Sequence, residues 1–438
     1  MNGPLLVLSL LLVFAQFALP RRLAFVPLLI AACHTPYYAT IGGQFSAVRL
    51  VLLAGLIRAT CTGLLDWHPR KPLDLLMAVW SGIALLSALG HETGNPLTYR
   101  AGLVLNVLGT FLYGRAYLRE HADFVQLIRA TAIVLIPLAA FLTLEAATGA
   151  NSYAAIGSRF SFAITRDDQN RAMGPFGTPI LAGTIGAVCF PLFVALWHQY
   201  RRTAFLGIVS SFAIISASAS SGPIGTFLLG TGALFLWRWR TSLGKVKLAA
   251  LALIAVIQLF RERSVLYLIA IIDFVGGSTG WHRSRLLESS LEHLEEWWFM
   301  GTDYTRHWMP YGLPSVPEHC DLTSYYVHLG VIGGLPLTLT LIALVFRSFN
   351  LLGRRIRAMR AVDAPEELLL WCAGCTLFAH AITFFTISYF DQLYVFFYLL
   401  LAAVPCLMRP TAAEIRSTPP PPAPVEMPAP ALPVFNLR

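Results

Sequence analysis

Charged residues are scarce in this chain of 438 residues, and their scarcity excludes an ordinary soluble protein. Only 13% of the residues are Asp, Glu, Lys or Arg, whereas 56% are hydrophobic. Soluble domains are typically about 25% charged. A water-soluble fold of this size cannot bury so much apolar surface, so we expect lipid to cover the excess.

Cysteines are few and poorly placed for disulfide bonds. Six of the seven lie inside apolar runs, where cysteine behaves as a small hydrophobic residue. The sequence Cys372-Ala-Gly-Cys375 has the spacing of a redox motif, but in a membrane helix its small residues indicate a packing face. We therefore expect no disulfide framework. Cys320 is the exception, since it lies in a loop beside a histidine.

Long hydrophobic runs, in contrast, fill the sequence. In lipid each backbone N–H and C=O needs a partner within its own segment, so runs close to the roughly 20 residues of a membrane span form helices. The sequence predicts an all-α, polytopic integral membrane protein with about 12–13 transmembrane helices. The runs are 5–20, 23–41, 46–65, 72–90, 101–118, 124–147, 174–197, 203–219, 223–238, 246–260 (extending to about 275), 323–346, 366–387 and 389–408.

The net charge of +9 follows a pattern along the chain. Basic residues cluster at every second connection between the apolar runs, whereas intervening connections carry acids, as at Glu92. This distribution orients membrane proteins with their basic loops in the cytoplasm. The charge therefore indicates topology, and we expect no nucleic-acid partner. The basic connections contain Arg21, Arg22, Arg70, Lys71, Arg115, Arg119, Arg201, Arg202 and the segments 238–247 and 347–360.

Alternation of the connections places residues 148–173 and about 276–322 opposite the basic loops, on the periplasmic side of a bacterial inner membrane. We assign residues 1–408 to one transmembrane domain and residues 409–438, with four prolines from Pro419, to a disordered cytoplasmic tail. We find no internal repeat of roughly 20–50 residues. Many transporters consist of two related halves, so this absence favours another function.

The loop at 276–322 predicts an amphipathic helix. Apolar residues recur at helical spacing from Leu286 to Trp298, and four glutamates occupy the opposite stripe. We expect this helix to lie along the outer membrane surface, with Trp297 and Trp298 at the level of the headgroups.

Two arginines, Arg283 and Arg285, precede that helix next to the bilayer. A guanidinium binds phosphate oxygens in a bidentate manner and stays charged at any working pH. These arginines could hold the pyrophosphate of a lipid-linked sugar, or they could merely anchor the loop at the headgroup layer. Spacing alone leaves both interpretations open.

His319 is the candidate general base, in the sequence Glu318-His-Cys-Asp321 just before the next apolar run. The pKa of histidine lies near neutrality, and a carboxylate such as Asp321 could orient the ring. An ordinary surface histidine is the alternative. We predict no metal site and no cofactor, because the other histidines of this region lack the tight H-x-x-x-H spacing of a metal motif: His282, His293, His307 and His328.

Three short motifs lie within about residues 155–345. His319-Cys320 is followed after nine residues by Gly330-Val-Ile-Gly333, Arg283 leads into a loop helix that ends before Gly301, and residues 171–179 read Arg-Ala-Met-Gly-Pro-Phe-Gly-Thr-Pro. In order, spacing and sidedness they resemble the O-antigen ligase and polymerase superfamily. Its signatures are H-(N/S/Q)-x9-G-x-x-G, an arginine before a loop helix, and R-x-x-G-x-F-x-x-P.

This resemblance implies a metal-independent membrane glycosyltransferase of the GT-C type. Such enzymes move a glycan from undecaprenyl pyrophosphate to an acceptor sugar on the periplasmic side, in lipopolysaccharide or exopolysaccharide synthesis. It implies that His319 activates the acceptor hydroxyl, and that Arg171 together with Arg283 or Arg285 binds the pyrophosphate. The implied partners are a lipid-linked oligosaccharide donor, a glycan or lipid-core acceptor, the membrane and other polysaccharide-assembly proteins.

Two positions depart from the family pattern. Cys320 stands where the family has Asn, Ser or Gln, and Ser220-Ser221-Gly222 replaces Ser-Arg-Gly at the outer end of a middle helix. These departures suggest a divergent branch, and polymerase and ligase are not distinguished. A polysaccharide flippase or other secondary transporter, and an inactive scaffold of an assembly complex, are the alternatives. Charged residues deep inside the runs are few, which favours the enzyme.

Overall fold

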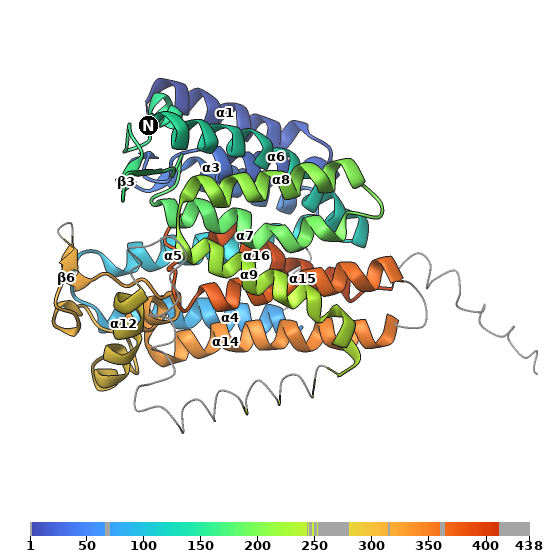
Figure 1. The fold of residues 1–438 in the computed structure, drawn as a ribbon. Helices are drawn as coiled ribbons and strands as arrows, with labels where there is room; N and C mark the ends of the chain where they lie inside the picture. The colour runs from blue at the N-terminus through green and yellow to red at the C-terminus, as the bar shows by residue number, and fades with distance from the viewer. Residues whose placement is uncertain are drawn as a thin grey trace, which may run out of the picture.

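The computed structural model describes residues 2–65, 71–242, 280–313, 316–359 and 364–410, with the single residues 244, 248 and 252. Most of this part of the chain is helical, and its strands form three short antiparallel hairpins (Figure 1). The predicted run at 246–260 and the proline-rich tail lie almost entirely outside the described residues.

Twelve of the thirteen predicted apolar runs contain an α-helix. The helix of the second run, 23–41, ends early, at His34, whereas the helix of the run 323–346 continues to Met359. The ring of Pro36 disfavours helical geometry at Thr35, and the chain turns into a hairpin there. The helices are α1 (Gly3–Ala18), α2 (Phe25–His34), α3 (Ala47–Cys61), α4 (Pro72–Leu86), α5 (Pro96–Tyr117), α6 (His121–Thr148), α7 (Pro179–Ala195), α8 (Arg201–Ser218), α9 (Ser221–Phe235), α14 (Tyr325–Met359), α15 (Ala364–Thr383) and α16 (Tyr394–Leu407).

Smaller elements fill the connections. The 3-10 helices are η1 (Arg21–Leu23), η2 (Ser87–Gly90), η3 (Ser152–Ile156), η4 (Leu236–Ser242) and η6 (Arg306–Trp308). The hairpins pair β1 (Thr40–Ile41) with β2 (Phe45–Ser46), β3 (Ile164–Arg166) with β4 (Gln169–Arg171), and β5 (Gly312–Leu313) with β6 (Val316–Cys320). Two further α-helices, α12 (Gly280–Glu292) and α13 (Leu294–Trp297), lie in the loop before α14.

The helices run back and forth between two ends of one bundle (Figure 1). At one end, here called the basic end, Arg21 pairs with Asp123 at 3.3 Å, Arg119 donates to Leu64 O, and Arg409 donates to Arg119 O. The other end, here called the loop end, carries the β3–β4 hairpin, α12, α13 and β6. The connections that were predicted to alternate in charge thus also alternate in space.

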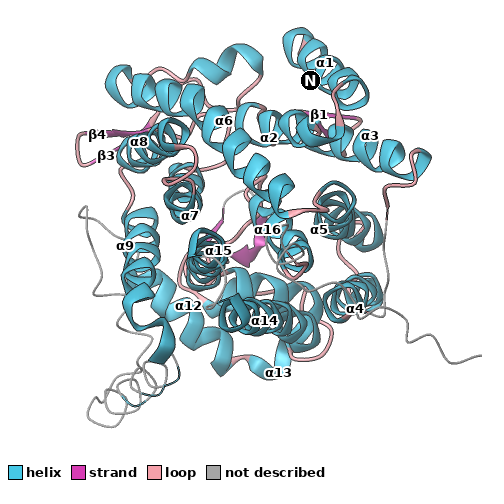
Figure 2. Cartoon of the chain, turned by 90° about the vertical axis from the view of Figure 1, so that its right-hand side faces the viewer, coloured by secondary structure: helices cyan, strands magenta, loops and turns pink. Residues whose placement is uncertain are grey.

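Helix α16 occupies the centre of the bundle, in contact with α5, α6, α14 and α15 (Figure 2). All of its residues are buried except Pro405, which is partly buried. Small residues allow the closest approach, because a Cβ on Gly114 of α5 would press against Ala402. The most apolar helix is therefore enclosed by protein.

Within the described ranges, three helical segments are long and apolar enough to cross a membrane: Pro72–Gly90, α6 and α14. Shorter apolar helices are α1, α7 and α16. Large apolar side chains, among them Phe14, Leu89 and Phe235, are exposed on the outside of the bundle. An apolar exterior around an apolar core is compatible with a membrane protein and unusual for a soluble one.

Helix α14 is broken where the loop packs against it. Gly334 adopts φ 71° and ψ −174°, a conformation that is essentially restricted to glycine. The Leu335 N–H then donates to Trp298 O at 2.8 Å, and the Thr302 N–H donates to Val331 O at 3.0 Å. The break thus lets the segment after α13 form backbone hydrogen bonds with a membrane-length helix.

Glycine is also required at this contact because the two segments lie too close together for a Cβ atom. A Cβ on Gly330 would collide with the ring of Trp297, and one on Gly334 would collide with Phe299 O. On the loop side, a Cβ on Gly301 (φ 93°) would collide with Val331 O. Gly330, which belongs to the motif quoted above, and Gly334, which lies one residue beyond it, therefore form the surface on which the loop docks.

We predict that Gly334→Ala destabilises the protein, because the strained backbone alone costs about 1–3 kcal/mol and the collision with Phe299 O adds to it. Gly82→Ala in α4 is the matched control, since no atom lies within 4 Å of its added Cβ. Thermal unfolding in detergent measures both. An unchanged melting temperature for Gly334→Ala would contradict the docking described here.

Candidate functional site

The predicted amphipathic helix exists as α12 and α13, with a break at His293. Its apolar face, however, is covered by protein. Leu286, Leu287 and Trp297 form a small core with Trp308 and with α14 side chains such as Val331. Trp297 is 5% exposed and donates to Ser290 O, whereas Trp298 is exposed. Trp297 is thus covered by protein and only Trp298 lies on the surface, because Gly330 leaves space for the Trp297 ring; their level relative to the headgroups stays a prediction.

Two of the predicted phosphate-binding arginines come together at the loop end. Arg171 on β4 donates from Nε to Ala219 O at 3.1 Å and from Nη2 to Ser220 Oγ at 2.7 Å. Arg283 of α12 reaches the same place, since a Cβ on Gly222 would lie 3.7 Å from its Nη1. Both guanidinium groups thus lie at the start of α9, where the sequence has Ser220-Ser221-Gly222.

Arg283 is buried, and it forms no salt bridge with a described acidic residue. It is 7% exposed, and its Nε has no hydrogen-bond partner among the described residues. Burial lowers its pKa from the usual range, Asp321 opposes this effect, and the cations Arg171 and Arg166 add to it. A guanidinium still stays protonated, so this is a buried positive charge. An unpaired buried charge is costly, and an anion bound beside it would remove that cost.

Arg285 has a different environment. Its two terminal nitrogens donate to the carboxylate oxygens of Glu292 at 2.9 and 3.0 Å, on the exposed side of α12. Of the two arginines proposed from the sequence, only Arg283 lies with Arg171.

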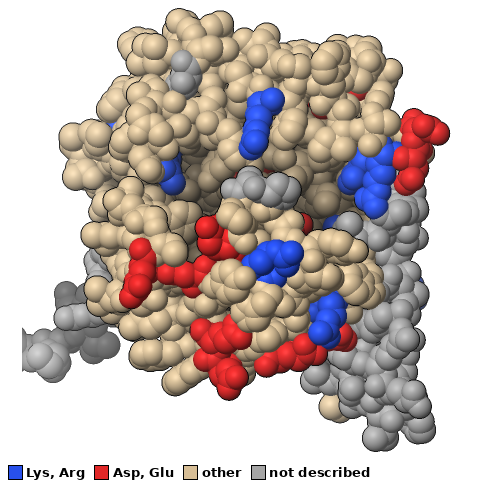
Figure 3. All heavy atoms as spheres, turned by 90° about the vertical axis from the view of Figure 1, so that its left-hand side faces the viewer, with Lys and Arg blue, Asp and Glu red and all other residues tan. Residues whose placement is uncertain are grey.

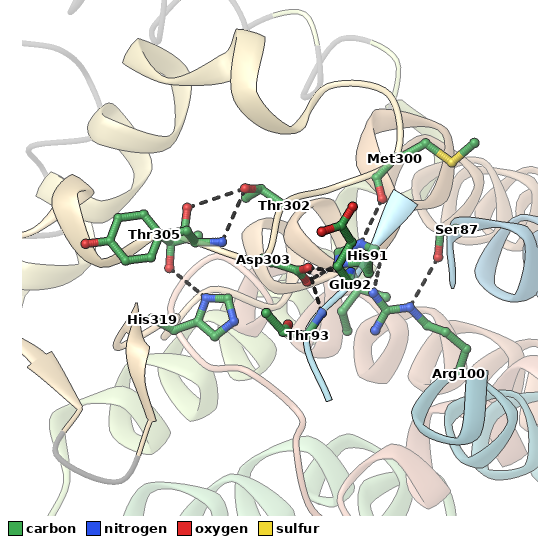
Figure 4. A network of polar contacts seen from close by, with 12 residues as sticks. Ser87, His91, Glu92, Thr93, Arg100, Met300, Thr302, Asp303, Thr305 and His319 are labelled. Atoms are coloured by element: carbon green, nitrogen blue, oxygen red, sulfur yellow. Dashed lines mark hydrogen bonds and ion pairs between the residues drawn. The ribbon is translucent and has the colours of Figure 1, made fainter. Parts of the chain in front are cut away.

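His319 lies on β6 at the same end, and it is partly buried. Its Nδ1 lies 3.1 Å from Thr305 Oγ1 (Figure 4). Asp321, which was expected to orient this ring, is exposed, and its backbone carbonyl lies 3.1 Å from His282 Nε2. The structure therefore places Thr305, rather than Asp321, on the His319 ring.

A second histidine and its acid hold the loop beside His319. His91 Nδ1 lies 2.5 Å from Asp303 Oδ1, and the backbone N–H groups of Glu92 and Thr93 donate to Asp303 Oδ2 (Figure 4). Partial burial opposes ionisation of Asp303, but these hydrogen bonds hold its pKa at about 2. Its carboxylate is therefore charged at neutral pH and acts on the neighbouring His319.

Arg100 joins this network from α5. It is buried, and it donates to Ser87 Oγ at 3.2 Å and to Ile332 O at 2.8 Å. His91 Nε2 lies 3.1 Å from the same Ile332 carbonyl, next to the break in α14. The connection between α4 and α5 is thus tied to the loop and to α14 by one set of polar contacts. Sequence reasoning missed it, because its members are more than 200 residues apart.

A cavity of about 290 Å³ opens between α3, α5 and the start of α14. Arg49 enters it and donates from Nε to Asn106 Oδ1 at 2.9 Å. His328, one turn into α14, also lines it. Its other walls are largely aromatic, with Tyr37, Tyr99, Tyr325, Tyr389, Phe390 and Tyr394. No sequence motif predicted this cavity, because its lining residues come from several separate apolar runs.

No known family model matches this chain, and no curated protein matches it. The functional interpretation therefore rests on the geometry and on the motifs quoted above.

We predict that His319 is neutral at pH 7. Burial lowers its pKa from 6.5, and the carboxylates of Asp303 and Glu318 only partly oppose this effect. Modification by diethyl pyrocarbonate, which requires a neutral ring, should therefore lose reactivity only below pH 6.5. Asp303→Asn should move that midpoint to still lower pH, because it removes a charge that favours the protonated ring. Peptide mass spectrometry measures both midpoints, and a midpoint that rises in the variant would contradict the prediction.

Proposed function

We propose that this protein is a polytopic inner-membrane glycosyltransferase. In this proposal it transfers a glycan from undecaprenyl pyrophosphate to an acceptor hydroxyl at the loop end, which faces the periplasm. The observation that carries the proposal is the meeting of Arg171 with a buried Arg283, whose Nε has no partner among the described residues, at the end of the bundle that bears His319.

The bundle supports the membrane part of this proposal. Its helices alternate between a basic end and a loop end, and cytoplasmic loops of membrane proteins are enriched in Lys and Arg. The exposed apolar side chains around the bundle would then contact lipid acyl chains. The loop end, with its short strands and polar network, would stand at the outer headgroup layer, where a lipid-linked substrate presents its phosphates.

The two arginines suit a pyrophosphate. Guanidinium groups form bidentate hydrogen bonds with phosphate oxygens, and these bonds strengthen in a water-poor site. Arg171 donates from Nε to Ala219 O and from Nη2 to Ser220 Oγ, and these hydrogen bonds fix its position. The Nε–H of Arg283, in contrast, has no partner among the described residues and could donate to a ligand. Together they could stabilise the charge that develops on the leaving pyrophosphate, which is the largest electrostatic change in the reaction.

His319 would accept the proton. The acceptor oxygen attacks the anomeric carbon, a new C–O bond forms, and the bond from that carbon to the phosphate oxygen breaks. The electron pair of the broken bond leaves with undecaprenyl pyrophosphate, and the hydroxyl proton moves to His319. A neutral ring at pH 7 is the form that a general base requires. Thr305 at Nδ1 leaves Nε2 as the proton acceptor.

The aromatic cavity suits a sugar. Ligand pockets commonly measure about 300–1,000 Å³, and this cavity lies at the lower limit, which is enough for a single unit of a glycan. Its tyrosine rings offer apolar faces and hydroxyls, and Arg49, Asn106 and His328 offer hydrogen bonds. We assign it to a sugar of the donor or the acceptor.

We predict that His319→Ala abolishes product formation in cells. A positioned base contributes about 10²–10⁴-fold to rate, so the variant should resemble a deletion strain. Glycan gels and lipid extracts of the deletion strain, complemented with wild type or variant at matched membrane levels, test this. Single repeat units left on the carrier would indicate a polymerase, and long polymer on the carrier would indicate a ligase. A variant that matches wild type would remove His319 from the mechanism.

We predict that Arg283→Ala and Arg285→Ala differ sharply, although they remove the same side chain two residues apart. Loss of a preorganised charge-stabilising donor costs about 10²–10³-fold in rate, so Arg283→Ala should lose nearly all transfer. Arg285→Ala removes an exposed ion pair, which contributes about 0–1 kcal/mol to stability, and should keep transfer within about twofold of wild type.

The measurement is transfer by the purified protein in proteoliposomes supplied with the lipid-linked donor. Equal activity of the two variants would overturn the assignment of Arg283. Accumulation of the donor inside the vesicles without transfer would instead support the transporter alternative.

A further inference from the structure

Three metal-ligating side chains converge on the outer side of the loop. Glu296 Oε1 lies 2.8 Å from His293 Nδ1 and 2.9 Å from His307 Nε2. These ligand atoms all lie within 4.8 Å of one another. His293 and Glu296 come from the junction of α12 and α13, and His307 comes from η6. The cluster shares no residue with Arg171, Arg283 or His319.

The three side chains are held in place by their neighbours. Trp308 Nε1 donates to the second carboxylate oxygen of Glu296 at 2.9 Å, which fixes the carboxylate. The His293 ring stacks on Trp308 with an interplanar angle of 6°, and the His307 ring stacks on Tyr304 with an angle of 11°. Outer contacts of this kind orient metal ligands, and they leave Glu296 Oε1 as the point where both histidines meet.

We propose that His293, Glu296 and His307 bind a first-row divalent transition metal ion, for which Zn²⁺ is the natural probe. Two imidazole nitrogens and one carboxylate oxygen form a donor set that Zn²⁺ accepts, with water in the fourth position. Binding replaces the two hydrogen bonds to Oε1 by bonds to the ion, and any ring proton at these nitrogens is released.

The surroundings favour a cation. Acidic side chains gather over the lower half of the loop end, where α12 and α13 lie (Figure 3). Trp308, His307 and His293 all surround the Glu296 carboxylate within hydrogen-bond distance. Both histidines remain accessible from solvent.

A metal here would clamp two parts of the loop. It would join the α12–α13 junction to η6, and η6 begins one residue after Thr305, which contacts His319. The role is structural and independent of the proposed transfer reaction. The spacing of the ligands, two residues and then ten, explains why no tight histidine motif revealed the cluster.

The test uses the full-length protein in detergent, stripped with a chelator and titrated with Zn²⁺ against a chromophoric indicator. Wild type should bind one equivalent. The double variant His293→Ala/His307→Ala should bind at least 100-fold more weakly, since the loss of an outer-shell contact alone costs about 10–100-fold. His282→Ala, on the same loop but outside the cluster, should bind like wild type.

Two further measurements guard against misfolding and adventitious binding. Glu296→Gln keeps the shape of the side chain and should also weaken Zn²⁺ binding, and Co²⁺ should give a tetrahedral absorption spectrum in wild type only. Equal affinity in wild type and double variant, or no bound equivalent in wild type, would overturn the proposal. Because no donor or acceptor is present, this result is independent of whether transfer occurs.

Discussion

The loop end depends on a backbone contact between the segment after α13 and the broken helix α14. Gly301, Gly330 and Gly334 meet there, and none of them has room for a Cβ. The contact fixes α13, and α12 before it, against a helix that is itself anchored in the bundle. Through it the side chain of Arg283 and the strand of His319 acquire defined positions. This contact thus makes the loop part of the packed structure.

Arg283 and Arg285 look alike in the sequence but have different electrostatic environments in the structure. Arg283 and Arg285 are two residues apart, yet one is buried beside another cation and the other is neutralised by Glu292 in solvent. The difference arises from the helical rotation between them, which turns one toward α9 and the other outward. A buried charge with an unsatisfied donor is costly, whereas an exposed ion pair contributes little. The two arginines have the same side chain, and only their surroundings in the fold distinguish their roles.

The helices were predictable because hydrophobicity and length are local properties, and twelve runs contain helices, although α2 ends early and α14 extends past its run. The early end of α2 was also determined locally, by Pro36. The packing of Trp297 was not, because it depends on Gly330, more than thirty residues away. The cavity around Arg49 and the cluster of His293, Glu296 and His307 were missed for the same reason. Their members meet only after the chain has folded. The roles of His319, Asp321 and the arginines stay predictions.

The central position of α16 has a consequence for how the protein is made. This helix is the last α-helix among the described residues, yet it contacts α5 and α6 from the first half and is enclosed on nearly all sides. During synthesis the faces of the earlier helices that will receive α16 must therefore stay without their final partner until α16 has been made. The bundle closes only when α16 packs between them. A ribosome stalled before residue 394 would leave an intermediate whose central helix is missing.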